Sequence, residues 1–570
     1  METESPAVAA LGPNDVVDAN VVKSLLSNLD RCITRNENDR LKHEGNPAQY
    51  VDSEVELHAS IQELHSLAAS PQFFPVMADH AKGRILGRFI QLLSHANATI
   101  AAGLLTLLAE MSEVNENVPK DVPYILDFVR ELLQRNVLDL VIDACNTFEW
   151  KQEPSSDLVS FDDDTEKGVA AALQLLENIM DIYKNDLEEA GGHDGLSQKS
   201  IAHGDAIKNS VMGLMDTLSM MLRKVGGFHF LKLHASEDLS SLLSLDVEAG
   251  KSVASRVSEE KEKVEEILDR LLQSQAGYRK KVPASAEEEE FYLNLTLCIS
   301  TFCKDEHVCK TTLVDLQGID LQLLILKEYK SSVCAQGALQ VLRYASSGDA
   351  QAVGVAAVEG GALKHAWPFL MGSRELNLKG PERDTILEHA VIFSSNLVNS
   401  LHSCTQADIC YRLAAKFKEG GSKKLRRVCA LFARYHSRVR QAELELEERV
   451  QAHREQVEQV QLAVGDVSSA NGASAQLLDS EERKLEMLEN DEVQYASRLE
   501  SGLGILQHLA TLACFGVLTD PSHLPIAEEV LDVSAVVSTI REMCAFLGAE
   551  EQKRKDLVGW LAKLQSLSRK

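Results

Sequence analysis

The sequence predicts an all-α fold in which armadillo/HEAT-like helix pairs form an α-solenoid, followed by a C-terminal helical region. Glycine and proline are scarce, with 32 and 13 occurrences in 570 residues, whereas the two together average roughly 12% of residues. Aromatic residues make up 5% of the chain, so the large side chains that favour β-strands are also few. The third observation is a leucine-rich motif that recurs along the chain.

The first 45 residues are predicted to form a mobile leader and one helix. The leader contains Gly12, Pro13 and Asn14, and the helix is expected around Val21–Ile33. Beyond Asp52 the apolar residues are mostly three or four positions apart, which is typical of an amphipathic helix. These positions are Val55, Leu57, Ile61, Leu64 and Leu67.

Residues 46–402 are predicted to be armadillo/HEAT-like repeats. The motif at residues 104–108 (Leu-Leu-Thr-Leu-Leu) returns in similar form at residues 172–176 and 338–342. Small residues before the motif let neighbouring helices approach closely, and leucines at i, i+1, i+3 and i+4 contact the repeats on both sides. Because one helix pair leaves its apolar face uncovered, degenerate copies are expected between the second and third motifs.

Residues 403–570 are predicted to be a helical region that carries a hairpin arm. Five apolar residues follow two interleaved seven-residue spacings, which are typical of paired long helices. They are Val439, Leu446, Val450, Val457 and Val460. The tip of the arm is expected at Gly465–Gln476, and the returning limb is expected to be one helix from Ser480 to Leu506. The sequence does not decide whether two copies of the chain form a homodimer through this arm.

The charge of the chain favours basic partners. It holds 58 Lys and Arg against 86 Asp and Glu, a formal net charge of −28. Direct binding to nucleic acid is not expected, because that affinity comes mainly from Lys and Arg. The 11 cysteines form no disulfide framework, and no secretory signal is visible, so reduced thiols are expected. No apolar run approaches the length of a membrane span, and no membrane association is predicted.

Motifs for catalysis and for metal or cofactor binding are weak. Gly250 and Lys251 resemble the end of a phosphate-binding loop, but Leu245 stands where the loop requires glycine. Cys298, Cys303 and Cys309 lack the spacing of a structural zinc site and are interpreted as buried helical residues. No nucleophile elbow is present. The chain is therefore predicted to be no enzyme, with no cofactor and no metal.

The candidate binding residues are acidic. An asparagine ladder, with which some solenoids hold an extended peptide, is not supported, because Glu110 and Tyr344 occupy the positions equivalent to Asn178. A basic peptide would then bind by charge. The alternative interpretation of the acidic run 287–290 is a helix N-terminus favoured by its dipole. The candidates for basic-peptide binding are Glu110, Glu113, Asn178, Asp181, Glu287, Glu288, Glu289 and Glu290.

Several segments, in the right order over roughly residues 46–550, resemble the beta-catenin-like protein 1 family. The most specific is residues 46–54 (Asn-Pro-Ala-Gln-Tyr-Val-Asp-Ser-Glu), followed by Leu57 and Ile61–His65. The others are Leu92–Ala109, Glu287–Glu290, Gly318–Asp320 with Ala338–Leu342, and Leu503–His508. The leader lacks the basic localisation cluster of that family.

The resemblance implies a nuclear armadillo-repeat protein that is associated with the spliceosome through the nineteen complex. It also implies recognition of Lys/Arg-rich, localisation-signal-like segments of spliceosomal proteins, and hence a non-catalytic scaffold of pre-mRNA splicing. The alternative is a cytoplasmic armadillo adaptor for another protein assembly. Nuclear entry would need a partner or the basic cluster Lys423–Arg427, which can equally be a solvated helix face because Leu425 and Val428 interleave with it.

Overall fold

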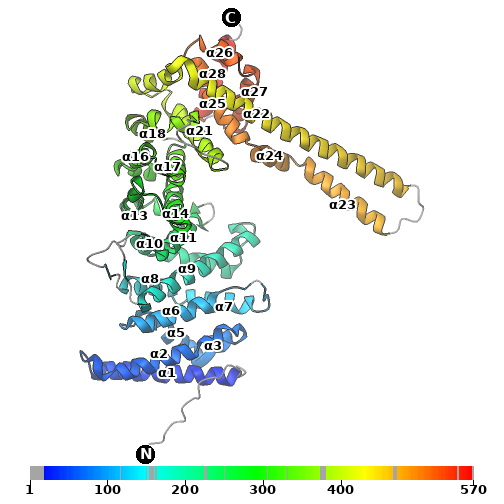
Figure 1. The fold of residues 1–570 in the computed structure, drawn as a ribbon. Coiled ribbons are helices and arrows are strands. Elements are labelled where there is room, and N and C mark those ends of the chain that lie inside the picture. The colour runs from blue at the N-terminus through cyan, green and yellow to red at the C-terminus, as the bar shows by residue number, and fades with distance from the viewer. Residues whose placement is uncertain are drawn as a thin grey trace, which may run out of the picture. The chain divides into compact units, whose positions relative to one another are not determined.

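The computed structural model shows a helical chain, as predicted (Figure 1). It describes residues 18–115, 117–148, 151–152, 159–160, 163–223, 228–248, 251–304, 306–329, 331–348, 350–372, 381–402, 404–465, 472–548 and 551–567. Residues 1–17 of the predicted leader and residues 466–471 of the predicted hairpin tip lie outside these residues, and a helix begins at Gly472, within the predicted tip. The chain divides into two compact units, Met1–Leu316 and Gln317–Lys570. The predicted three-part division at residues 45 and 402 stays a prediction.

The first unit contains fifteen α-helices among its described residues. They are α1 (Ala19–Lys42), α2 (Val51–Glu63), α3 (His65–Ala68), α4 (Phe74–Asp79), α5 (Arg84–Gln91), α6 (Ala98–Ser112), α7 (Val122–Leu133), α8 (Val137–Thr147), α9 (Asp163–Glu189), α10 (Gln198–Arg223), α11 (Phe230–Ser244), α12 (Val253–Val257), α13 (Lys261–Ala276), α14 (Ala286–Cys303) and α15 (His307–Asp315). Two short antiparallel hairpins join them, β1 (Lys151–Gln152) with β2 (Val159–Ser160) and β3 (Asp246–Glu248) with β4 (Lys251–Ser252).

The second unit contains no strand among its described residues. Its helices are α16 (Gly318–Glu328), α17 (Ser332–Ala345), α18 (Gln351–Glu359), α19 (Ala362–His365), α20 (Trp367–Met371), α21 (Pro381–Leu401), α22 (Ala407–Gly465), α23 (Gly472–Glu489), α24 (Asp491–Glu500), α25 (Leu503–Leu518), α26 (His523–Glu528), α27 (Val533–Phe546) and α28 (Gln552–Leu567).

The three copies of the leucine motif lie on α6, α9 and α17, and these helices belong to a set that packs in pairs. Helix α6 packs on α9 and α11 on α14 in the first unit, and α17 packs on α21 in the second. All apolar residues of the three motif copies are buried, as the repeat prediction requires. The helices approach closely where Gly168 lies, since a Cβ atom there would stand 2.9 Å from the Cβ of Ala102. Small residues thus set the spacing between these helices.

A second feature recurs in all three pairs: an asparagine of the later helix donates a hydrogen bond to a serine in, or directly after, the earlier helix of the pair. Asn178 Nδ2 donates to Ser112 Oγ at 2.9 Å, Asn294 Nδ2 to Ser236 Oγ at 3.3 Å and Asn396 Nδ2 to Ser346 Oγ at 3.3 Å. In the first and third pairs the asparagine also donates to a backbone carbonyl, Ala109 O or Arg343 O, both at 3.1 Å. These asparagines tie successive repeats together.

We expect Asn178→Ala to lower the free energy of unfolding by about 1–2 kcal/mol, because two hydrogen bonds to partly buried acceptors are lost. Denaturant unfolding followed by circular dichroism measures the change. Gln174→Ala is the matched control, since Gln174 is exposed and its described hydrogen bonds reach only Glu177 and Asn178. An equal loss in both variants would contradict the structural role of Asn178.

The hairpin arm is present, but its returning limb differs from the prediction. Helix α22 pairs with α23, and Val439, Val450 and Val457 are buried as expected. The returning chain is not one helix, because Asn490 ends α23 and caps α24 by accepting from the Glu492 N–H at 2.7 Å. Gly502, with φ +99°, then separates α24 from α25. Both interruptions follow from residues that favour caps and left-handed backbone.

Within the part of the chain that the structure describes, no single helix has both the length and the apolar composition to cross a membrane. Helices α24 and α25 meet those two criteria only when taken together, with a bend of 66° between them.

Candidate functional site

The predicted acidic residues on α6 and α9 lie at the surface. Glu110 is exposed and accepts from His65 Nδ1 at 2.6 Å. Glu113 follows the end of α6, and Asp181 lies on α9, both exposed and without an ion pair among the described residues. Asn178 uses both amide hydrogens within the chain, as described above. The predicted role of Asn178 in peptide binding stays a prediction. The same holds for the predicted roles of Glu110, Glu113 and Asp181.

The four glutamates at the start of α14 differ in their exposure to solvent. Glu288 is 2% exposed, whereas Glu287 and Glu290 are exposed and Glu289 is half-buried. Ser285 caps the helix by accepting from the Glu288 N–H at 3.2 Å. The carboxylate of Glu288 accepts from Lys281 Nζ at 2.5 Å, from the Ala284 N–H at 2.7 Å and from Tyr278 Oη at 3.0 Å. This side chain therefore stabilises the start of α14.

The Glu288 network makes a pH prediction. Burial raises the pKa of Glu288, but the bonds from Lys281, the Ala284 N–H and Tyr278 outweigh it and lower the pKa below 4.5. A lowered pKa stabilises the fold above the unfolded-state pKa, and this contribution is lost as the pH falls through the folded-state value. At pH 7 we expect Glu288→Gln to cost about 1–3 kcal/mol. Thermal unfolding from pH 7 to 3 should show this deficit shrinking below about pH 4.5; a constant deficit would contradict the ionic network.

Four carboxylates gather between α9 and α11, which pack against each other; we call them the α9–α11 acidic cluster. They are Glu177, Asp181, Glu237 and Asp238. Asp238 is 3% exposed, and its Oδ2 has no hydrogen-bond partner among the described residues. His234 lies beside the cluster, with its Nδ1 3.1 Å from Glu237 Oε2. No described lysine or arginine forms an ion pair with any of the four.

Burial and mutual repulsion raise the pKa values of two members of the cluster, Asp238 and Glu177. Burial raises the pKa of Asp238 well above its usual value, and the charges of Glu177, Glu237 and Asp181 raise it further. Burial and the charges of Asp181 and Glu237 also raise the pKa of Glu177. A buried carboxyl without a partner is costly, and a cation placed among these residues would relieve the cost.

Sequence reasoning found one member of this cluster, Asp181, and missed the other three. Glu177 and Asp181 are four residues apart on one helix and therefore share a face, which is a signal that the sequence contains. Glu237 and Asp238 belong to α11, and the long helix α10 separates them from α9 in the chain. Their proximity to α9 follows from the stacking of the repeats.

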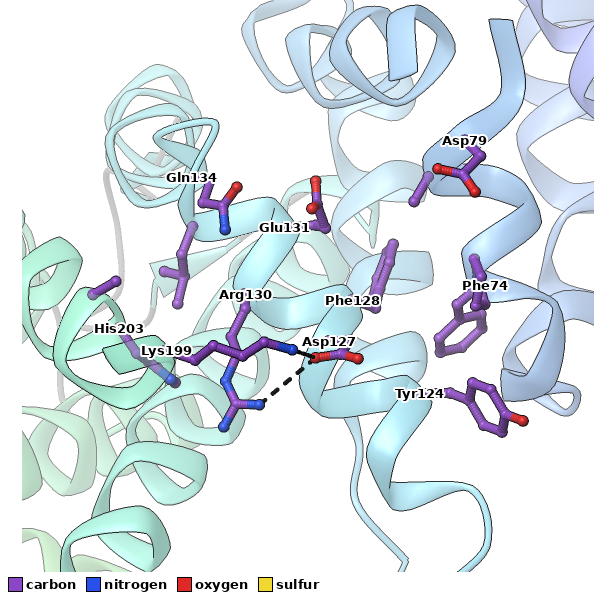
Figure 2. Close-up of a pocket in the computed structure, with 14 residues that line it drawn as sticks. Phe74, Asp79, Tyr124, Asp127, Phe128, Arg130, Glu131, Gln134, Lys199 and His203 are labelled. Atoms are coloured by element: carbon purple, nitrogen blue, oxygen red, sulfur yellow. Dashed lines mark hydrogen bonds and ion pairs between the residues drawn. The ribbon is translucent and has the colours of Figure 1, made fainter. Parts of the chain in front are cut away.

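A cavity of about 330 Å³ lies between α4, α7 and α10 (Figure 2). Phe74, Phe128 and Tyr124 line one side, and Phe74 and Phe128 pack with ring centroids 4.9 Å apart. On the other side Lys199 Nζ and Arg130 Nη1 point to Asp127 Oδ1, at 2.7 Å and 3.8 Å. Asp127 is thus paired within the cavity, whereas Arg130 Nε and both ring nitrogens of His203 have no hydrogen-bond partner among the described residues.

The chemistry of this cavity does not resemble an active site for nucleophilic catalysis. None of its described lining residues is Ser, Thr or Cys. His203 is 1% exposed, and burial lowers its pKa to about 4, so the ring is neutral near pH 7. A histidine with so low a pKa is a poor general base at neutral pH.

The cysteine prediction is confirmed. Cys298, Cys303 and Cys309 are buried and free, and burial raises the pKa of Cys309 to about 12. No group of three or more His, Cys, Asp or Glu side chains able to hold a metal ion occurs among the described residues.

Comparison with known proteins gives consistent matches. A family model described as "Catenin-beta-like, Arm-motif containing nuclear" matches residues 4–467. Beta-catenin-like protein 1 of Homo sapiens is 23% identical over 502 residues, which cover 86% of this chain and 75% of the relative. The Beta-catenin-like protein 1 homolog of Schizosaccharomyces pombe is 23% identical over 414 residues, which cover 72% and 64%.

A solved structure, a designed armadillo repeat protein in complex with peptide (KR)4, is 13% identical with a TM-score of 0.34 and covers 54% of this chain and 98% of that chain. The family match confirms the resemblance stated from the sequence and the armadillo-repeat fold class.

Proposed function

Since this chain belongs to the catenin-beta-like family of armadillo-repeat proteins, we propose that it is a non-catalytic scaffold of pre-mRNA splicing. In this proposal it works in the nucleus and binds Lys/Arg-rich, localisation-signal-like segments of spliceosomal proteins, including those of the nineteen complex. The proposal involves no direct contact with nucleic acid and no cofactor. The net charge of −28 favours such basic partners.

The α9–α11 acidic cluster is the observation that carries this proposal. A Lys or Arg side chain that enters the cluster would meet several carboxyl groups. Its positive charge would give the Asp238 carboxyl group the partner that it lacks among the described residues. Charge-assisted hydrogen bonds to carboxylates are about twice as strong as neutral ones. The exposed carboxylates Glu110 and Glu113 would extend the acidic surface and raise the association rate by electrostatic steering.

Affinity purification from nuclease-treated cells tests the proposal. The tagged wild-type chain should retain splicing proteins that carry basic segments, as identified by mass spectrometry. A variant with Glu177, Asp181, Glu237 and Asp238 changed to amides should lose them. Retention of the same proteins by both chains would contradict binding through this cluster, and their absence from both would contradict the splicing role.

A cytoplasmic adaptor remains the second candidate, and one observation favours it. The basic cluster Lys423–Arg427 lies on α22, where Leu425 and Val428 are fully buried. Lys424 and Arg426 are paired with Glu419 and Glu529 at 2.6 Å each, so this segment is held as a helix face. Imaging of the tagged full-length protein separates the two: nuclear signal supports the splicing scaffold, and exclusion from the nucleus supports the adaptor.

A further inference from the structure

Two cysteines differ from the other nine in their environment. Cys404 and Cys410 are partly exposed, whereas all the other cysteines are buried. Cys404 lies between α21 and α22, and Cys410 lies in the first turns of α22. Their sulfur atoms are 3.7 Å apart. The two most accessible thiols of the chain therefore lie side by side.

We propose that Cys404 and Cys410 form a reversible redox pair, which closes to an intramolecular disulfide by exchange with a low-molecular-weight disulfide such as glutathione disulfide. A disulfide bond is about 2.05 Å long, so the sulfur atoms must approach by less than 2 Å from their separation of 3.7 Å. Cys404 belongs to a connecting segment, where the backbone can make such a shift more easily than within a packed helix.

The local contacts indicate which of the two cysteines reacts first with the disulfide. Cys410 Sγ donates to Leu401 O at 3.0 Å and to Cys404 O at 3.4 Å. Burial, and after it the Cys404 thiol, raise the pKa of Cys410, so it is the poorer initial nucleophile. Cys404 Sγ donates a single longer bond, to Gln406 O at 3.5 Å. Cys404 is therefore the residue that reacts first.

The reaction balances with glutathione disulfide as the oxidant. The Cys404 thiolate attacks one sulfur of glutathione disulfide, and one glutathione thiolate leaves. Cys410, after loss of its proton, attacks Cys404 Sγ and displaces the second glutathione. Two protein thiols are oxidised by two electrons, one glutathione disulfide is reduced to two glutathiones, and the two protons pass to the leaving thiolates.

The bond would tie the connecting segment to the first turns of α22. This part of α22 ends at a break over Glu419–Ser422, where Gly420, Gly421 and Ser422 have positive φ. Beyond the break α22 packs on α25 and, with α23, forms the arm. Oxidation would thus restrain the short helical segment 407–418 at the base of α22. The proposal does not depend on the splicing role.

Mass spectrometry of the full-length chain tests the pair. Both cysteines fall in one tryptic fragment, residues 384–412. After equilibration with excess glutathione disulfide and alkylation of free thiols, that fragment should lack both alkyl groups and weigh two hydrogens less than its reduced form. Glutathione should restore the free thiols. Hydrogen exchange in residues 404–418 should slow in the oxidised form.

Serine variants separate the roles of the two thiols. In Cys410→Ser, glutathione should remain bound to Cys404, because no second thiol displaces it. Cys544→Ser is the matched control, since Cys544 is buried, and it should form the disulfide as the wild-type chain does. Alkylation of both thiols after oxidation of the native protein, or a disulfide that appears only in denaturant, would overturn the proposal.

Discussion

A chain with Glu177→Gln, Asp181→Asn, Glu237→Gln and Asp238→Asn should bind a Lys/Arg-rich peptide about 30- to 4,000-fold more weakly than the wild-type chain. Loss of one partner from a buried charge pair costs about 2–5 kcal/mol, and a rim charge contributes much less. Asp238, at 3% exposure, should account for most of the loss. The four-amide chain should be as stable as wild type or more stable, because the removed carboxyls repel one another.

Fluorescence anisotropy of a labelled peptide at two salt concentrations measures this loss. The matched control removes four exposed carboxylates from the arm, Glu447, Glu448, Glu458 and Glu486, and changes the net charge equally. The control should reduce affinity slightly at low salt and hardly at physiological salt, where screening acts over about 8 Å. Equal losses in both chains would mean that net charge, and not the α9–α11 acidic cluster, governs binding.

Trp367→Ala should lower the free energy of unfolding of the second unit by about 3–5 kcal/mol, the usual cost of removing a large aromatic side chain from a core. Trp367 is 1% exposed, and its ring meets that of Phe417 edge-on at 5.3 Å. Its Nε1 has no hydrogen-bond partner among the described residues, so the loss is one of packing. Circular dichroism during denaturant unfolding measures it.

Trp367→Phe is the matched control for that prediction. It keeps an aromatic ring against Phe417 and removes an N–H group that lacks a described partner, so it should cost much less than the alanine change. A Trp367→Phe chain as unstable as Trp367→Ala would show that the indole N–H makes an interaction that the structure does not describe.

The repeats were predictable because their signal is local. The motif at residues 338–342 combines helical spacing with small neighbours, and its apolar residues are all buried against adjacent helices. The interruption at Asn490 was equally local, since asparagine is a strong cap former, yet the returning limb was predicted to be one helix from Ser480 to Leu506. The position of a helix boundary therefore depends on cap-forming residues as well as on the apolar pattern of the helix.

The candidate site was predictable only in part, because its chemistry depends on contacts between distant segments. In the sequence, Glu288 is indistinguishable from the three glutamates beside it. In the structure, Tyr278 and Lys281 donate hydrogen bonds to its carboxylate, and the side chain is buried. Asp238 gives no signal in the sequence, and its environment arises when α11 stacks on α9. Charge composition predicts a basic ligand, and the packing of the repeats brings together four carboxyl groups that have no described Lys or Arg partner.

The asparagine pattern shows how the same residue type serves different roles. Asn178 and Asn396 each donate to a serine and a backbone carbonyl of the preceding helix. An amide nitrogen carries two hydrogens, so none is left in either side chain for an external carbonyl. Binding by charge is therefore more consistent with this surface than binding by an amide ladder.

The most direct test is to locate a bound basic peptide on the chain. A Lys/Arg-rich peptide that carries a photoreactive group is bound to the full-length protein and cross-linked, and mass spectrometry identifies the attachment sites. The account predicts attachment within residues 173–189 of α9 and 230–244 of α11, and its loss in Asp238→Asn. A peptide that binds with the same affinity but attaches elsewhere, or that does not bind at all, would contradict the account.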